Sequence, residues 1–240
     1  MPSPLFLAAT AAEFQAMQTI SDKIGWMACH FSPYGTGISN LPPALPAGSM
    51  LILNDRTPVY GHDPQRIADT LSALAEQYQC SRILLDLQRP GEALTQRIVR
   101  AVTEAAGCPV GVTPPYAEDP ACPVLLPPVP PHQTPQDYLS PWEGRRVWLE
   151  VALNSALYRI TEQGCHTEAA LSEGSFPHRD EALHCHYNIS IRPDAIEFHL
   201  CRQADDLPGL LQDASQAECF VGLHQELSQA LAHCTAFSQP

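Results

Sequence analysis

The 240-residue sequence predicts an α/β fold, an irregular closed (β/α)8 barrel of the TIM type with a small antiparallel β insertion. Three observations predict it. Short apolar segments recur along the chain, amphipathic helical segments separate several of them, and the length is common for one barrel. We expect a single domain over residues 1–240, with the insertion at about 155–201. An open doubly wound sheet is the alternative, but no glycine-rich turn of the dinucleotide-binding kind follows a strand.

Eight apolar segments are the expected barrel strands. In chain order they are residues 26–32, 49–54, 82–88, 110–114, 124–127, 147–153, 183–191 and 219–223. Segments of this length, rich in β-branched and aliphatic residues and bounded by proline or polar clusters, are typical of buried strands. The sequence therefore supplies enough strands to close a barrel.

Three helices are expected between these strands. Residues 64–78 begin with Asp63 and Pro64, a good N-cap and first-turn pair. Apolar residues at helical spacing also mark residues 92–106 and 206–216. The connections 33–48 and 115–123 are too short and too rich in proline for full helices, which makes the barrel irregular.

The insertion is expected to be two hairpins. Residues 155–171 read as two strands around Gln163 and Gly164, and residues 184–201 read as a hairpin that turns at Pro193 and Asp194. In this reading residues 183–191 serve both the barrel and the hairpin. The face that carries Cys185, Tyr187, Ile189 and Ile191 is the expected core face of the hairpin.

Composition limits the partners and the compartment. A net charge of −13 argues against nucleic acid, which attracts basic surfaces. No apolar run is long enough to span a membrane, and the N-terminus lacks the basic start of a signal peptide. The nine cysteines are irregularly spaced with no C-x-x-C pair, which favours free thiols in the cytoplasm. We expect no cofactor, and composition leaves the oligomeric state open.

The ends of the predicted strands carry polar residues. Side-chain alternation places Asp86 and Gln88 on one face of their strand and the aliphatic residues on the other, so the polar pair should face the barrel mouth. Glu150 and His30 also approach the mouth on their own strands, and Tyr116 follows another. Asn54 and Asp55 lie at a further strand end.

One of these segments resembles a known signature. "ILLDLQRP" is similar to the D-G-x-D-x-D-x-E motif of the chitinase-type glycoside hydrolases (family 18), which ends the fourth strand of a (β/α)8 barrel. In that family the final Glu is the general acid, and the preceding Asp orients the acetamido group of the substrate. The resemblance places Asp86 at the Asp position and Gln88 at the Glu position, with Ser81 and Leu84 where earlier aspartates belong. A carboxamide cannot act as the acid, so the resemblance implies a degenerate site or an acid elsewhere, with Glu150 the nearest candidate.

The expected pocket is lined by His30, Asp86, Gln88, Tyr116 and Glu150. We assign Asp86 and Glu150 to catalysis, the other three to contacts with a small sugar-like ligand, and no residue to a metal. Several alternatives remain open. In two of them the carboxylates are structural: Asp86 only stabilises the local fold, and Glu150 pairs with a neighbouring arginine. In a third the protein is an active hydrolase that uses Asp86 and Glu150, and in a fourth the barrel is a scaffold for protein interaction.

Two further features separate these alternatives. A sugar site should place Trp26, Trp148 or Tyr116 beside the carboxylate, and a scaffold should show an exposed apolar patch instead. His184 and His186, two residues apart, would reach a shared metal if they project from one strand face, and the metal-assisted hydrolase is the corresponding alternative.

Overall fold

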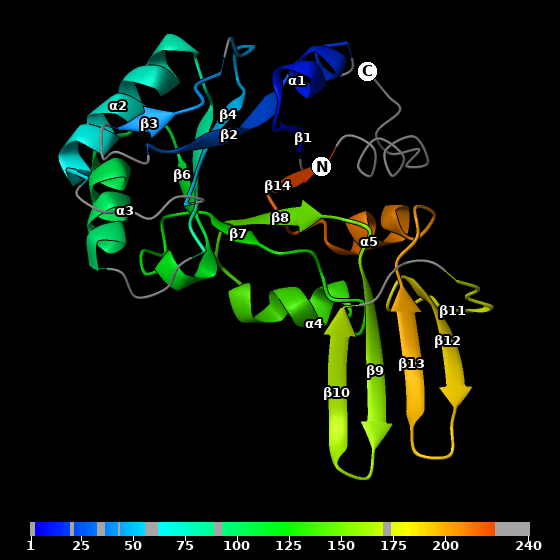
Figure 1. The fold of residues 1–240 in the computed structure, drawn as a ribbon. Coiled ribbons are helices and arrows are strands. Elements are labelled where there is room, and N and C mark those ends of the chain that lie inside the picture. The colour runs from blue at the N-terminus through cyan, green and yellow to red at the C-terminus, as the bar shows by residue number, and fades with distance from the viewer. Residues whose placement is uncertain are drawn as a thin grey trace. The chain divides into compact units, whose positions relative to one another are not determined.

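The computed structural model describes residues 3–19, 22–32, 37–42, 44–55, 62–88, 93–169 and 174–223. The chain divides into two compact units (Figure 1). We call them the barrel unit (Met1–Leu126, Gly144–Glu150 and Ala217–His224) and the sheet unit (Pro127–Glu143, Val151–Gln216 and Gln225–Pro240). The expectation of one domain over residues 1–240 stays a prediction.

Eight parallel strands form a closed ring, which confirms the predicted barrel. In ring order they are β1 (Ser3–Ala8), β2 (Ile24–Phe31), β4 (Met50–Asn54), β5 (Arg82–Asp86), β6 (Val110–Val112), β7 (Val124–Leu126), β8 (Val147–Val151) and β14 (Cys219–Leu223). The ring closes because β1 pairs in parallel with both β14 and β2. A short strand, β3 (Ile38–Ser39), lies antiparallel on β2.

The barrel interior is a packed core. One cluster of buried residues from six of the strands fills it: Leu5, Leu7, Met50, Ile52, Leu84, Leu125, Trp148, Cys219 and Val221. Trp148 is fully buried, and a Cβ on Gly111 would lie 2.2 Å from its ring. The absence of a side chain at Gly111 on β6 therefore makes room for the indole. The guanidinium of Arg82 lies 5.8 Å from the same ring.

Helices follow three of the barrel strands. They are α1 (Ala11–Met17), α2 (Pro64–Gln77) and α3 (Ala93–Ala105). The carboxylate of Asp63 accepts a hydrogen bond from the amide of Gln65 at 3.0 Å, as expected for the N-cap of α2. Between β6 and β7 the chain forms only a 3-10 turn, η1 (Pro114–Tyr116), so the predicted gap in the helical layer is present.

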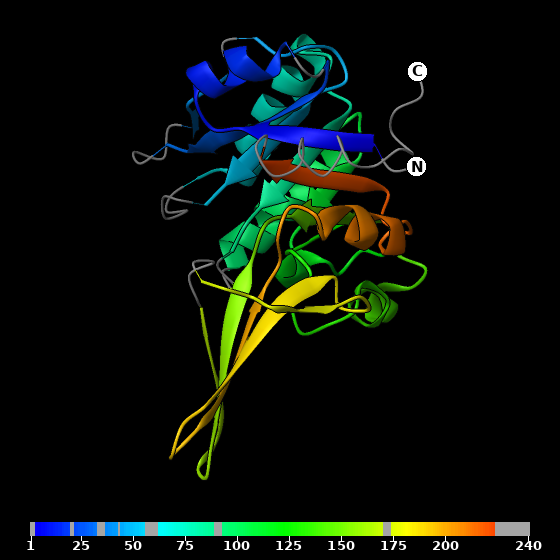
Figure 2. The ribbon, with the colours of Figure 1, turned by 90° about the vertical axis from the view of Figure 1, so that its right-hand side faces the viewer.

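The sheet unit contains a five-stranded antiparallel sheet. Its order is β10 (Gly164–Ala169), β9 (Ser155–Thr161), β13 (Ile196–Cys201), β12 (Cys185–Ile191) and β11 (His178–Asp180). Both predicted hairpins are present, and Figures 1 and 2 show them side by side. The unit also holds α4 (Pro135–Leu139), the turn η2 (Ser140–Trp142) and α5 (Leu207–Asp213).

We call the end of this sheet that lies away from the two hairpin turns its base. A buried arginine makes polar contacts there. Arg202 is 2% exposed and donates hydrogen bonds to the carbonyls of Val129, Leu183 and His184. His184 lies against α5, where a Cβ on Gly209 would be 2.5 Å from its ring. The base of the sheet is therefore tied to both the segment before α4 and to α5.

Two details of the sequence prediction were wrong. Residues 183–191 do not contribute a barrel strand, because Cys185–Ile191 pairs only within the antiparallel sheet; the missing barrel strand is β1, near the N-terminus. Ile189 and Ile191 are 42% and 81% exposed, so the expected core face of the hairpin is uncovered at its outer end. In the part of the chain that the structure describes, no helix has the length and apolar character to cross a bilayer.

Candidate functional site

Three neighbouring barrel strands bring polar side chains together at their carboxyl ends. The strand register pairs His30 with Asn54 and Asn54 with Asp86. Registered residues of parallel strands project to the same face, and Ile52 and Leu84, two positions earlier, belong to the interior cluster. His30, Asn54 and Asp86 therefore form one row above the packed interior, as alternation predicted for His30 and Asp86.

Gln88 lies directly against Asp86. Its side-chain nitrogen donates to Oδ1 of Asp86 at 2.5 Å. Its main-chain amide donates to Oδ2 of Asp55 at 3.0 Å, and Asp55 is only 8% exposed. A buried carboxylate on the neighbouring strand end thus fixes the backbone of Gln88, and Gln88 presents its amide group to Asp86.

A β-bulge in β2 shapes the next part of the row. The register between β2 and β4 shifts between Trp26 and Cys29, and the carbonyl of Met27 accepts a hydrogen bond from the side chain of Asn54 at 2.8 Å. Nδ1 of His30 is 2.9 Å from the carbonyl of Ala28, which requires the hydrogen on Nδ1. The bulge therefore anchors Asn54 and orients the imidazole of His30.

A second histidine packs against the end of β2. His62 is 5% exposed, and its ring centroid lies 5.1 Å from that of Phe31. Burial lowers the pKa of His62, which favours the neutral imidazole. Within the described residues neither of its ring nitrogens has a hydrogen-bond partner.

Glu150 stands on a different part of the ring. It follows Trp148 by two residues on β8, so it faces the interior, but β6 and β7 separate β8 from β5. The neighbouring arginines have other partners: Arg146 forms an ion pair with Glu218 at 2.8 Å, and Arg145 donates to the carbonyl of Asp119. The acid and base roles assigned to Asp86 and Glu150 remain predictions.

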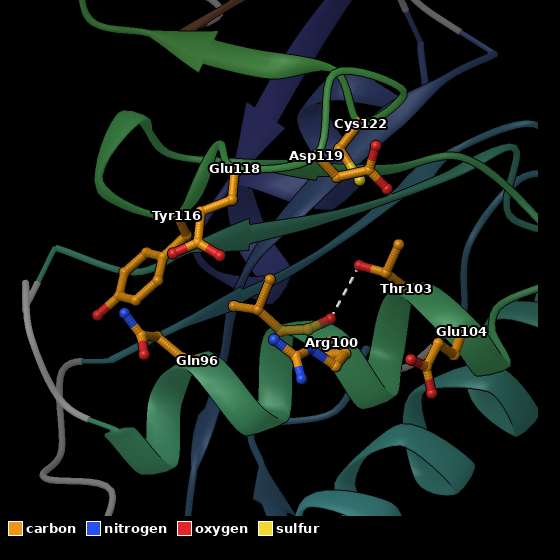
Figure 3. A pocket seen from close by; sticks show the side chains of 9 residues that line it. Gln96, Arg100, Thr103, Glu104, Tyr116, Glu118, Asp119 and Cys122 are labelled. Carbon is orange, nitrogen blue, oxygen red and sulfur yellow. Dashed lines mark hydrogen bonds between the residues drawn. The ribbon is translucent and has the colours of Figure 1, made fainter.

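The three aromatic residues expected beside a sugar are all buried. Trp148 is inside the barrel, and Trp26 contacts Phe14 of α1 with ring centroids 6.1 Å apart. Tyr116 is 5% exposed and lines a hollow of about 400 Å³ between α3 and the segment from β6 to β7. Figure 3 shows its ring near Gln96 of α3. None of the three presents an open ring face for stacking.

The paired histidines of the sheet unit do not converge. Nε2 of His184 lies 2.8 Å from Asp213, at the end of α5, whereas Nδ1 of His186 lies 3.0 Å from Asp206, at its start. One group of side chains in the described part has metal-compatible spacing: His186, Asp205 and Asp206 have ligand atoms within 4.8 Å of one another. Asp206 is also 3.3 Å from the guanidinium of Arg179, a cation already beside that carboxylate.

Comparison with known proteins establishes the fold. No protein-family model matches the sequence, and the search of curated proteins finds no match. The structure is similar to the spore cortex-lytic enzyme SleL of Bacillus cereus, with a TM-score of 0.58, 10% identity, and coverage of 98% of this chain and 75% of that one. SleL of Bacillus megaterium QM B1551 gives a TM-score of 0.53 and 9% identity, with 92% and 70% covered. At this level of identity the likeness shows the shared fold alone.

Two residues that support the row were not assigned to the site from the sequence. Asn54 ends β4 and Asp55 follows it, and their side chains form hydrogen bonds with the main chain of Met27 and Gln88, respectively. The sequence does contain a signal for them, because this polar pair directly follows the four apolar residues 50–53. The hydrogen bond between Asp55 and Gln88 joins residues that are 33 positions apart in the sequence. It depends on the strand register, which the sequence does not show.

Proposed function

We propose that the carboxyl ends of β2, β4 and β5 bind a sugar-like ligand, and that this site does not hydrolyse glycosides by the conventional acid mechanism. The observation that carries the proposal is the hydrogen bond from the side chain of Gln88 to Asp86 at the end of β5. Once β1 is counted, β5 is the fourth barrel strand along the chain, the strand on which the chitinase-type signature ends.

The chemistry of this pair supports binding without proton transfer. A general acid must lose a proton in the transition state, and a carboxamide does not. The side chain of Gln88 keeps a donor and an acceptor, and Asp86 adds carboxylate oxygens. Together with His30 and Asn54 they offer the mixed polar groups that hydroxyl or acetamido substituents need. Because the nearby aromatic rings are buried, recognition rests on hydrogen bonds rather than on ring stacking.

Two further observations concern the class of the ligand and the compartment in which the protein acts. The structural neighbours are described as spore cortex-lytic enzymes, which supports a ligand of the carbohydrate class. The eight cysteines in the described part of the chain are free thiols, which supports a reducing compartment such as the cytoplasm.

Gln88→Glu is the sharpest test. A carboxylate at this position would lie against that of Asp86, and two acids in such contact share a proton, which raises one of their pKa values. We expect the wild type to release no chromophore from aryl glycosides. We expect Gln88→Glu to show weak turnover, about 100-fold above background, with a bell-shaped pH profile. The measurement is aryl alcohol release across a panel of aryl sugars.

Matched variants define the result. Gln88→Asn keeps a carboxamide and should show no turnover, while Asp86→Asn should weaken glycan binding measured by calorimetry. If the wild type hydrolyses the substrates and Glu150→Gln abolishes this, the site is an active hydrolase with its acid on β8. If no variant turns over any substrate and no glycan binds, the proposal is wrong.

A further inference from the structure

Four exposed isoleucines lie together on the outer part of the antiparallel sheet. Six large apolar side chains in the described residues are at least 40% exposed, and four of them belong to this sheet. They are Ile160, Ile189, Ile191 and Ile196. We call them the isoleucine patch. This concentration separates the patch from the scattered exposed apolar residues that every protein has.

The strand register places all four on one face. Ile196 of β13 pairs with Ile160 of β9 and with Ile191 of β12, and Phe198 pairs with Ile189. Directly opposed residues of antiparallel strands project to the same side, as do residues two positions apart on one strand. The patch is therefore continuous across three strands. Cys165 of β10, paired with Ile160, extends it to the edge of the sheet.

The inner part of the same face is covered by the unit itself. Tyr158 contacts His132 through its hydroxyl group, and Arg202 reaches the carbonyl of Val129, so the segment that precedes α4 covers the base. The four isoleucines lie beyond these contacts, toward the turns of the two hairpins that Figure 2 shows far from α4 and α5. The apolar face continues past the segment that covers it.

The opposite face of the same strands is polar. Glu197 is 6% exposed and is held between Arg159 and Arg192, at 2.7 and 2.8 Å. Both carboxylate oxygens of Glu197 therefore accept hydrogen bonds from arginines of the same sheet. Both faces are in contact with water, but the exposed side chains around Glu197 are charged arginines, whereas those on the isoleucine side are apolar.

We propose that the isoleucine patch is a docking surface for a second copy of this chain, formed by the two patches packing face to face. The face of one twisted sheet, covered by β-branched side chains, can pack on a second copy of the same face, as the two layers of a β-sandwich do. A two-fold axis through the contact makes the interface isologous, so that one patch suffices for both partners.

Charge favours this occupant. The chain carries a net charge of −13, but residues 158–165 and 189–198 around the patch hold two arginines against three carboxylates. The patch is thus close to neutral, and two copies approach there with little local repulsion. An anionic membrane surface would meet the acidic remainder of the chain with too few basic residues to offset it.

The size of the patch sets the strength of the contact. The four side chains together expose about as much surface as two fully exposed isoleucines. That is well below the roughly 800 Å² per partner of a standard interface. We therefore expect a reversible dimer whose population grows with protein concentration.

Sedimentation velocity over a wide concentration range tests the proposal on the full chain. The weight-average mass of the wild type should rise with concentration. Ile191→Thr and Ile196→Thr keep a β-branched residue in the strand, so the sheet should stay folded, and each should weaken association about tenfold or more. Leu41→Thr removes an apolar side chain of the barrel unit that is 45% exposed, close to the 40% of Ile196, and should change nothing.

A chemical cross-link gives a second measurement. Cys165 is exposed and shares the isoleucine face, so a short bismaleimide should link two copies through it. The cross-linked dimer should disappear in Cys165→Ser and decrease in Ile191→Thr. A wild type that is monomeric throughout, an association unaffected by the threonine variants, or binding to neutral lipid vesicles in place of self-association would each overturn the proposal.

Discussion

The two sheets of this protein differ in how much of their apolar surface is covered. In the barrel, all five residues of β4 are buried, because one face of the strand meets the interior and the other is covered from outside. In the antiparallel sheet, β12 begins at the buried Cys185, continues with half-buried residues and ends at Ile191, which is 81% exposed. The closed ring leaves no strand edge, whereas the open sheet keeps two edges and one uncovered apolar face.

Because of this difference, the two sheets expose functional groups at different places. A closed barrel with a packed interior exposes only its strand ends, so polar groups such as Asp86 and Gln88 gather there. An open sheet offers its face and its edges. The proposed ligand site and the proposed docking surface therefore follow from the two topologies.

The largest effect we expect comes from emptying the barrel interior. Trp148 is fully buried and occupies the space left by Gly111. Trp148→Ala should lower the free energy of unfolding by about 3–5 kcal/mol, because it removes a large apolar side chain and leaves a cavity. Chemical denaturation followed by circular dichroism measures this loss.

A second tryptophan provides the control. Trp142 in η2 is half-buried in the sheet unit, so Trp142→Ala should cost much less. Equal losses for the two variants would contradict the packed interior. Gly111→Ala should also destabilise the barrel, and the combination with Trp148→Leu should cost less than the sum, since the smaller side chain makes room for the new methyl group.

The sequence predicted the barrel because its strands are short continuous apolar runs, which parallel buried strands require. The same criterion should have excluded residues 183–191, where polar and apolar residues alternate in "HCHYNISI", the pattern of a half-exposed antiparallel strand. It should also have included "SPLFLA" at residues 3–8. Periodicity therefore predicts which kind of sheet a strand joins.

The candidate site was partly predictable for a similar reason. Alternation along β5 is enough to direct Asp86 toward the mouth. The support from Asn54 and Asp55 depends on the register between strands and on a bulge in β2, and neither follows from local sequence. The exposure of Ile189 and Ile191 was also unpredictable, because a sequence pattern shows that a face is apolar and does not show whether anything covers it.

Breaking the base of the open sheet should have the next largest effect. Arg202 is buried, and burial lowers its pKa to about 10, so it remains charged at neutral pH. Arg202→Met leaves the carbonyls of Val129, Leu183 and His184 without this donor. We expect a loss of about 2–4 kcal/mol, measured as faster hydrogen exchange of the amides in β12 and β13. Arg192→Met removes an exposed partner of Glu197 and should cost under about 1 kcal/mol.

The smallest effect concerns the contact between the sheet and α5. The hydrogen bond from His184 to Asp213, at 2.8 Å, holds the pKa of Asp213 below its ordinary value of 3.8, against the opposing effect of burial. A carboxyl group whose pKa is depressed in the folded state stabilises the protein above its ordinary pKa, and this contribution is lost as the pH falls through the lowered value. Asp213 is 38% exposed, so screening should keep the effect under about 1 kcal/mol.

Hydrogen exchange of α5 at pH 6 and near pH 3 measures this contribution. Protection of α5 in the wild type should fall on acidification by more than it does in Asp213→Asn, whose amide does not titrate. Asp194→Asn, in the exposed hairpin turn, should behave as the wild type. If Asp213→Asn loses as much protection as the wild type between the two pH values, the pair with His184 does not anchor α5. The helix would then be held by its buried residues Leu207, Leu210 and Leu211 alone, and the base of the open sheet would rest on apolar packing as the barrel interior does.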